Sequence, residues 1–274
     1  MAGKQHKRND LSVQTSVPRF ARQTPAPEAR VRLFCLPFAG GSSAVFHGWG
    51  ARLAPEIEVW AAQPRARGMR FREKPLGSVA EMAEEYLEAM RPGLSARPFA
   101  FYGHSLGGLL SFEITRRLHA EGLPLPEHLF IGATVPPHMG LIHERIGHLE
   151  DAAFVEAIQE RYGGIPEEVR REPELMELFL PALKTDFLAY EGHLHRQAKK
   201  VPVPVTVFAG VEDHASTAAL LEEWERHTSG PFTLHEMAGD HFFLAESREQ
   251  VLLRIRMALE DGTARELVRV EERA

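Results

Sequence analysis

A serine in a glycine-flanked turn is the side chain in this sequence best suited to nucleophilic chemistry. Ser105 lies in the stretch FYGHSLGGLL (101–110), where Gly103 and Gly107 complete the pattern Gly-x-Ser-x-Gly. The pattern follows an apolar run and opens a helical one, which is typical of a strained turn that lifts a serine above a sheet. A Cβ at either glycine would clash in so tight a turn. We therefore predict a nucleophile at Ser105, against the alternative of a turn with an incidental hydroxyl.

A serine nucleophile needs a base, and that base needs a carboxylate to orient it. His241 in AGDHFFL follows the last predicted strand, and Asp213 in FAGVEDH follows the strand before it. Ligands of open parallel sheets bind beyond the carboxyl ends of the strands, so both loops belong at the same edge as the serine. We assign Asp213 as the acid and His241 as the base. The other candidates are the acids Glu212 and Asp240 and the base His214, whereas His104 is expected to give structural support.

Acyl transfer also needs two donors for the oxyanion that forms on the carbonyl oxygen. The backbone N–H of Leu106, directly after the nucleophile, is one expected donor. The second should come from the loop after the first predicted strand, LPFAGG (36–41), where Gly40 and Gly41 let the backbone bend. We assign this second donor to Ala39. A plain strand-to-helix turn is the alternative interpretation of the loop.

Apolar runs bounded by turn residues predict a buried parallel sheet covered by helices on both faces, an α/β fold. The predicted strands are 31–38, 57–62, 98–103, 128–134, 203–210 and 232–237. The predicted helices are 78–91, with a capping box of Ser78 and Glu81, then 106–122, 215–227 and about 247–260. Residues 138–200 carry helical patterns without a convincing strand, so we expect a helical lid inserted between two core segments, 31–137 and 201–262. We expect a disordered lead-in at 1–30 and a tail at 263–274.

Composition excludes several classes of function. The 274 residues are 44% hydrophobic and 26% charged, with a net charge of −6 and no basic stripe, so nucleic acid is not an expected partner. No apolar run approaches the roughly 18 residues of a membrane span. The single cysteine, Cys35, is expected to be a buried apolar residue in a reducing compartment. The histidine pairs His143/His148 and His193/His195 lack a third metal ligand. We expect a cytoplasmic monomer.

Five stretches together resemble a known family: LFCLPFAGGSSAVFHGW, YGHSLGG, HLEDAAFVEAIQERYGGIPEEV, LPALKTDFLAYE and AGDHFFL. Over residues 31–260 the chain resembles the type II thioesterases, stand-alone α/β-hydrolases that accompany polyketide synthases and nonribosomal peptide synthetases. The resemblance implies the α/β-hydrolase fold and hydrolysis of acyl thioesters on the phosphopantetheine arm of acyl or peptidyl carrier proteins. It implies editing of stalled acyl groups or product release, and no metal or organic cofactor.

The sequence departs from this family after the second predicted strand, where a Pro-Gly-Arg turn is usual. Arg65-Ala66-Arg67 stands there, and the segment to residue 74 carries five cations against Glu73 alone. We predict that Arg65, Arg67 and Arg70 dock an acidic carrier protein, although a solvated loop fits the pattern equally well. The expected substrate-binding side chains are Phe38 and Phe242 beside the catalytic loops, and Phe154, Phe187 and Tyr190 in the lid.

Four other activities stay open at this point. A general carboxylesterase or a lipase would use the same fold and the same three side chains on an oxygen ester. An acyltransferase would pass the acyl group to an amine or alcohol instead of water. A noncatalytic binding protein could also keep the fold, although a complete serine, acid and base set argues against it.

Overall fold

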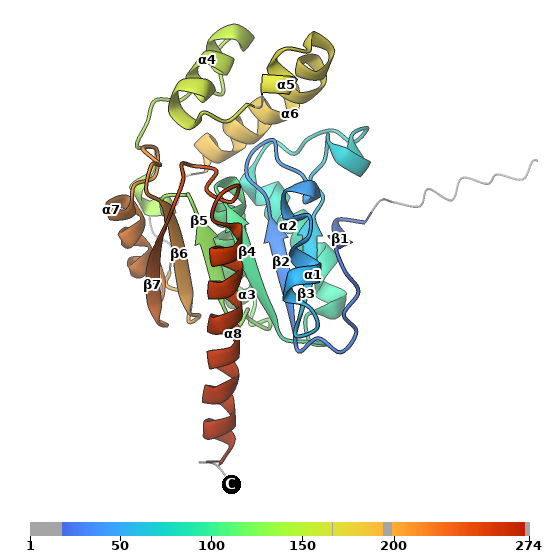
Figure 1. Ribbon diagram of the computed structural model, residues 1–274, viewed down its shortest axis with the longest axis vertical. Coiled ribbons are helices and arrows are strands. Elements are labelled where there is room, and N and C mark those ends of the chain that lie inside the picture. The colour runs from blue at the N-terminus through green and yellow to red at the C-terminus, as the bar shows by residue number, and fades with distance from the viewer. Residues whose placement is uncertain (1–17, 166, 194–198, 272–274) are drawn as a thin grey trace, which may run out of the picture.

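A seven-stranded sheet lies at the centre of the protein, in a computed structural model that describes residues 18–165, 167–193 and 199–271 (Figure 1). The strand order is β1-β3-β2-β4-β5-β6-β7, and every neighbouring pair is parallel except β1 with β3. The strands are β1 Phe20–Arg22, β2 Val31–Leu36, β3 Ile57–Ala62, β4 Phe99–His104, β5 Leu129–Gly132, β6 Val205–Gly210 and β7 Phe232–Met237.

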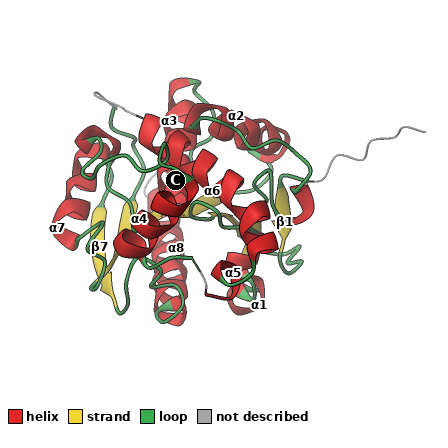
Figure 2. Cartoon of the chain, turned by 90° about the horizontal axis from the view of Figure 1, so that it is seen from above, coloured by secondary structure: helices red, strands yellow, loops and turns green. Residues whose placement is uncertain are grey.

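Helices cover both faces of this sheet, as the alternation of strands and helices predicts. On one face lie α2 (Val79–Met90), α3 (Leu106–Ala120) and the short α7 (Ala218–Leu221); on the other lie α1 (Trp49–Leu53) and α8 (Arg248–Glu271) (Figure 2). Each face of the sheet has its own hydrophobic core. Strand β2 contributes to both, because successive side chains of a strand point to opposite faces. Its residues Phe34 and Leu36 pack toward α2 and α3, whereas Leu33 and Cys35 pack toward α1 and α8.

Three helices between β5 and β6 gather above one end of the sheet (Figure 1). They are α4 (Asp151–Tyr162), α5 (Glu167–Arg170) and α6 (Pro173–Gly192), which we call the insertion helices. They share a small core of their own, which includes Phe154, Ile158 and Leu180. The end of the sheet beneath them is the one at which β4 meets Ser105, so the insertion helices lie over the predicted nucleophile. Within the described residues, no helix is both long and apolar enough to cross a membrane.

Three predicted boundaries are wrong. The fold begins before Val31, because β1 (Phe20–Arg22) pairs antiparallel with β3 inside the predicted lead-in. The helix expected over 215–227 is only α7, followed by a 3₁₀ segment at Glu222–His227. Helix α8 continues to Glu271 and so occupies most of the stretch expected to be a tail. Ser78 is confirmed as the N-cap of α2, since its hydroxyl accepts a hydrogen bond from the Glu81 backbone at 3.2 Å.

Candidate active site

Ser105 occupies a strained turn between β4 and α3. Its φ of 53° and ψ of −118° lie in a region that side-chain-bearing residues rarely adopt. The turn is held by a hydrogen bond of 2.7 Å from the Ser105 N–H to the carbonyl of Gly132. A Cβ on Gly103 would lie 2.1 Å from the Gly107 carbonyl oxygen, and one on Gly107 would lie 2.0 Å from that of Leu36. Both glycines are therefore required by close backbone contact, as the sequence predicts.

Asp213 and His241 form a buried pair at the same edge of the sheet. The imidazole Nδ1 of His241 lies 2.9 Å from Oδ2 of Asp213. The other carboxylate oxygen accepts the backbone N–H groups of Ala215 at 2.9 Å and Ser216 at 3.0 Å, and the Ser216 hydroxyl donates to Oδ2. Burial alone would raise the pKa of Asp213, but the hydrogen bond and charge of His241 and the bonds from Ser216 lower it to about 2. The carboxylate is thus ionised at neutral pH.

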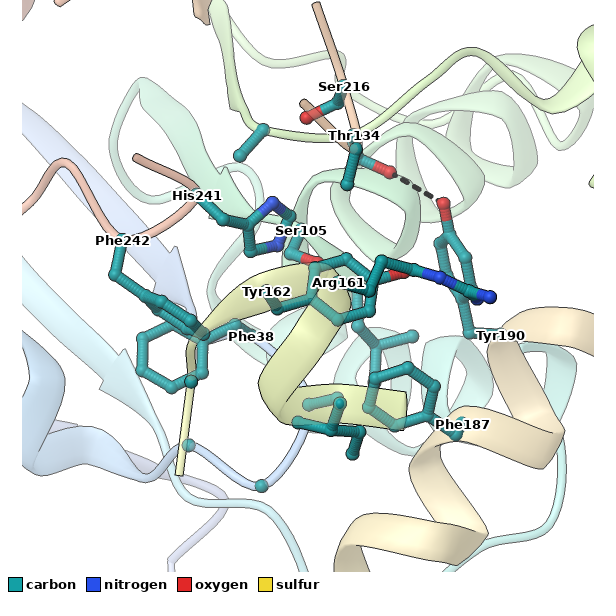
Figure 3. Close-up of a pocket in the computed structure, with 18 of the residues that line it drawn as sticks. Phe38, Ser105, Thr134, Arg161, Tyr162, Phe187, Tyr190, Ser216, His241 and Phe242 are labelled. Carbon is teal, nitrogen blue, oxygen red and sulfur yellow. Dashed lines mark hydrogen bonds between the residues drawn. The ribbon is translucent and has the colours of Figure 1, made fainter. Parts of the chain in front are cut away.

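The tautomer of the neutral His241 ring follows from this pairing. An ionised carboxylate accepts but cannot donate, so Nδ1 of His241 carries the proton and Nε2 is left as a base. His241 and Ser105 both line one cavity (Figure 3). The ring of Tyr162, from the end of α4, lies 4.8 Å from the His241 ring.

His104 supports the site from beneath, as expected for a histidine beside the nucleophile. Its side chain is fully buried, and Nε2 lies 2.7 Å from the backbone carbonyl of His241. That carbonyl can only accept, so Nε2 is the protonated nitrogen, and Nδ1 accepts from the Tyr102 hydroxyl at 3.2 Å. Burial lowers the pKa of His104 to about 3, so the ring is neutral. It therefore holds the backbone of the predicted base in place.

The alternative acids and bases lie in poorer positions. Glu212 and His214 are exposed on either side of Asp213. Asp240 is also exposed, and its Oδ1 accepts the N–H of Phe242 at 2.7 Å within its own turn. The geometry thus favours Asp213 over Glu212 and Asp240 as the acid, and His241 over His214 as the base.

The predicted oxyanion donors border the same cavity as Ser105. Leu106 is the first residue of α3, and the first N–H groups of a helix have no acceptor within it. Ala39 lies in the loop after β2, where Gly40 has a φ of +76°. The N–H of Gly41 is already bonded to the Phe38 carbonyl at 2.9 Å, which closes the loop into a turn. The helix end and the loop can therefore approach an oxygen at the serine from two sides.

A cavity of about 580 Å³ opens from Ser105 beneath the insertion helices (Figure 3). Four of the five predicted substrate-binding side chains line it: Phe38, Phe242, Phe187 and Tyr190. The prediction for Phe154 is wrong, because its side chain is fully buried among the insertion helices, where its ring packs 5.5 Å from that of Phe187. Sequence reasoning missed Tyr162 and Arg161, which also line the cavity. The sequence offers one indication of these two residues: they lie within HLEDAAFVEAIQERYGGIPEEV, one of the stretches that carry the family resemblance.

A docking role for Arg70 is wrong. Its side chain is 0% exposed, and its guanidinium donates to the Gln63 carbonyl at 2.8 Å, to Glu85 at 2.6 Å and to Glu73 at 2.7 Å. Every one of these partners belongs to this chain, so the charge is neutralised internally. Arg70 instead anchors the 66–74 loop to the body of the protein.

Arg67 is equally unsuited to docking, because it is directed inward. Its side chain is 13% exposed, and Nη2 lies 2.6 Å from Oδ2 of Asp186 on α6. Arg65 is 30% exposed, and its Nε donates to Glu85 at 2.8 Å. Of the three predicted docking arginines, Arg65 is the most exposed, and its charge is already paired.

Comparison with known proteins places the chain in a family. A family model described as "Thioesterase domain" matches residues 31–259. Thioesterase PikA5 of Streptomyces venezuelae is 39% identical over 228 residues, which cover 83% of this chain and 80% of the relative.

Solved structures agree with the sequence match. The type II thioesterase BorB from the borrelidin biosynthetic cluster superposes with a TM-score of 0.78 at 33% identity, covering 89% of this chain and 97% of BorB. RedJ, a thioesterase of the prodiginine pathway in Streptomyces coelicolor, gives a TM-score of 0.80 at 30% identity, covering 89% and 96% of the two chains. The predicted α/β-hydrolase architecture is confirmed, and the chain belongs to the thioesterase family.

Proposed function

We propose that this protein hydrolyses acyl thioesters borne on the phosphopantetheine arm of acyl or peptidyl carrier proteins, as an editing or releasing enzyme of polyketide or nonribosomal peptide biosynthesis. The observation that carries the proposal is the Asp213–His241 pair, 2.9 Å apart, at the rim of the cavity that holds the strained Ser105. BorB and RedJ, which are named as thioesterases of biosynthetic pathways, support the substrate class.

The proposed reaction proceeds in two half-steps through an acyl-enzyme. Nε2 of His241 takes the proton of the Ser105 hydroxyl, whose oxygen attacks the thioester carbonyl carbon. The N–H groups of Ala39 and Leu106 stabilise the oxyanion, and the C–S bond then breaks as His241 returns the proton to the departing sulfur. Water attacks the acyl-serine, His241 takes its proton, and the free acid leaves with Ser105 restored. Asp213 keeps the imidazole in the required tautomer and stabilises its cation.

A comparison of leaving groups tests this proposal. The protein is offered a panel of acyl groups on a holo carrier protein, and separately the same acyl groups as oxygen esters, with products followed by mass spectrometry. We expect free acid from the carrier thioesters at a higher kcat/KM than from the esters. A clear preference for oxygen esters would instead indicate a carboxylesterase or lipase, and acyl transfer to an added amine or alcohol would indicate an acyltransferase. No reaction with a serine-directed fluorophosphonate would indicate a binding protein.

We place the docking surface for the carrier on the outer side of the 66–74 loop, in place of the arginines assigned from the sequence. Met69 is 71% exposed and Phe71 is 61% exposed, and the cations Arg72 and Lys74 are exposed beside them. The buried Arg70 fixes this loop from below, so the apolar pair is presented on a rigid support. An apolar centre with a cationic rim suits an acidic carrier whose arm bears a phosphate.

Substitutions on the outer side of this loop should raise KM only for the carrier-bound substrate. For Arg72→Glu/Lys74→Glu and for Met69→Ser/Phe71→Ser, we expect KM for an acyl carrier protein to rise about tenfold, a typical loss for interface side chains. KM for a small soluble acyl thioester should not change, since that substrate needs no docking. Matched controls are Arg226→Glu, an exposed cation beyond β6, and Leu253→Ser, an exposed leucine on α8. Equal changes for both substrates would exclude this surface as the docking site.

A further inference from the structure

A buried carboxylate on α6 contacts the loop that carries a proposed oxyanion donor. The side chain of Asp186 is 1% exposed, and its Oδ2 accepts the backbone N–H of Gly40 at 2.8 Å. This N–H belongs to the peptide unit directly after Ala39. The hydrogen bond fixes the plane of the Ala39–Gly40 peptide unit. A fixed peptide plane restricts the dihedral angles on both sides of it, so the bond also limits the orientation of the neighbouring Ala39 N–H.

Apolar contacts from the same helix reinforce this bond. Gly40 adopts a φ of +76°, and a Cβ there would lie 2.8 Å from both the Leu183 side chain and the Phe179 ring. Phe179, Leu183 and Asp186 are one helical turn apart on α6, so a single face of the helix contacts the loop. The path of the loop is therefore set by an insertion helix as well as by the end of β2.

The ion pair with Arg67 is difficult to explain by stability alone. Nε and Nη1 of Arg67 are buried and, within the described residues, have no hydrogen-bond partner. Burial raises the pKa of Asp186 above its usual value, because desolvation outweighs the attraction of Arg67 and the bond from Gly40. Buried ion pairs with incomplete hydrogen bonding are often no more stable than an apolar packing of the same volume. A requirement for a fixed oxygen acceptor at the Gly40 N–H would account for a polar side chain at this buried position.

We propose that Asp186 is a positioning residue that orients the oxyanion loop from α6, with Arg67 fixing the carboxylate in turn. This inference rests on the proposed function. It means that the insertion helices are part of the catalytic apparatus and do more than cover the acyl cavity. Any displacement of α6 would withdraw the acceptor from Gly40 and misplace the Ala39 donor, so the enzyme would be fully active only with α6 seated on the loop.

Asp186→Ala and Asp186→Asn test the positioning role. For Asp186→Ala we expect kcat on a small acyl thioester to fall by about 30-fold, since loss of one oxyanion donor typically costs ~10²–10³ and misplacement costs less. KM should change little, because the acyl cavity is intact. Affinity for a boronic acid that forms a tetrahedral adduct on Ser105 should fall in parallel with kcat. Asp186→Asn keeps an oxygen acceptor for the Gly40 N–H and should recover most of both losses.

Lys184→Met is the matched control on the same helix. In the unmutated protein the Lys184 ammonium donates to the Leu149 carbonyl at 2.7 Å and to Asp151 at 2.8 Å. Both bonds lie away from the oxyanion loop. Lys184→Met should lower the melting temperature without changing kcat or boronate affinity.

Three results would overturn the positioning role: a loss of kcat with unchanged boronate affinity, an effect on KM alone, or Lys184→Met matching Asp186→Ala. If Asp186→Ala does not fold, the isosteric Asp186→Asn carries the test, and full loss of kcat in that variant despite a native fold would also overturn the role. If the unmutated protein binds the boronate but hydrolyses no thioester, it is the proposed function that fails.

Discussion

Ser105→Ala is expected to abolish thioester hydrolysis while leaving the fold unchanged. Loss of the nucleophile in a serine hydrolase lowers kcat on the order of 10⁵-fold or more, because the remaining groups cannot substitute for it. The fold should tolerate the change, since the Ser105 hydroxyl makes no capping hydrogen bond to α3. Alanine at a φ of 53° is strained to a similar degree as serine, so the turn is not further destabilised.

Mass spectrometry of acyl carrier protein incubated with stoichiometric enzyme measures this effect directly. The Ser105→Ala protein should leave the thioester intact and should not be labelled by a fluorophosphonate. Ser111→Ala is the matched control: Ser111 lies on α3, fully buried, and its hydroxyl donates to the Gly108 carbonyl at 2.8 Å. Ser111→Ala should lower stability and keep activity. Activity above a hundredth of normal in Ser105→Ala would show that another group is the nucleophile.

Much of the core could be predicted from the sequence because its strands are buried on both faces. Such strands are continuously apolar, so β3 at 57–62 and β7 at 232–237 are predicted with their observed bounds. Strand β1 was missed, because three residues at the edge of a sheet give almost no pattern, and its neighbours are rich in proline and polar residues. Its pairing with β3 depends on a strand about 40 positions away in the chain.

The proposed catalytic side chains could be selected from the sequence because they lie close to strand ends, which the sequence marks. The cavity-lining side chains of the insertion helices were less predictable. Phe154 and Phe187 are both aromatic residues on amphipathic helices, and periodicity does not distinguish a face that packs on a helix from one that lines a cavity. Asp186 interrupts the apolar face of α6, where a carboxylate needs a partner. The sequence therefore indicates that Asp186 has a partner. It does not indicate which one, because Gly40 and Arg67 lie more than 100 residues away along the chain.

The docking prediction for the basic segment was wrong for a similar reason. Five cations near one acid suggest a solvated, positively charged loop. Arg70 instead pairs with Glu85 on α2, 15 positions along the chain, and Arg67 pairs with Asp186. A local count of charges takes no account of such partners, so it overestimates the charge that the loop presents to solvent.

Asp213→Asn is expected to lower kcat by about 10⁴-fold, as loss of the orienting carboxylate does in serine proteases, with the fold retained. The structure gives a reason specific to this site. Oδ1 of Asp213 accepts the backbone N–H groups of Ala215 and Ser216, so an asparagine must keep its carbonyl oxygen in that place. Its NH₂ group then points at His241 Nδ1, which becomes an acceptor. The imidazole proton moves to Nε2, and the base can no longer take a proton from Ser105.

The pH dependence of stability separates this effect from unfolding. The pKa of Asp213 is lowered from 3.8 to about 2 in the folded protein, so the stability that it contributes is complete above 3.8 and is lost as the pH falls toward 2. Asp213→Asn should lack this contribution, and its melting temperature should fall less steeply than that of the unmutated protein over that interval. At neutral pH its kcat should be low while Ser105 and the cavity still bind a substrate analogue. Nearly normal kcat at neutral pH would mean that a different carboxylate orients His241, and Asp240, one residue before it, would be tested next.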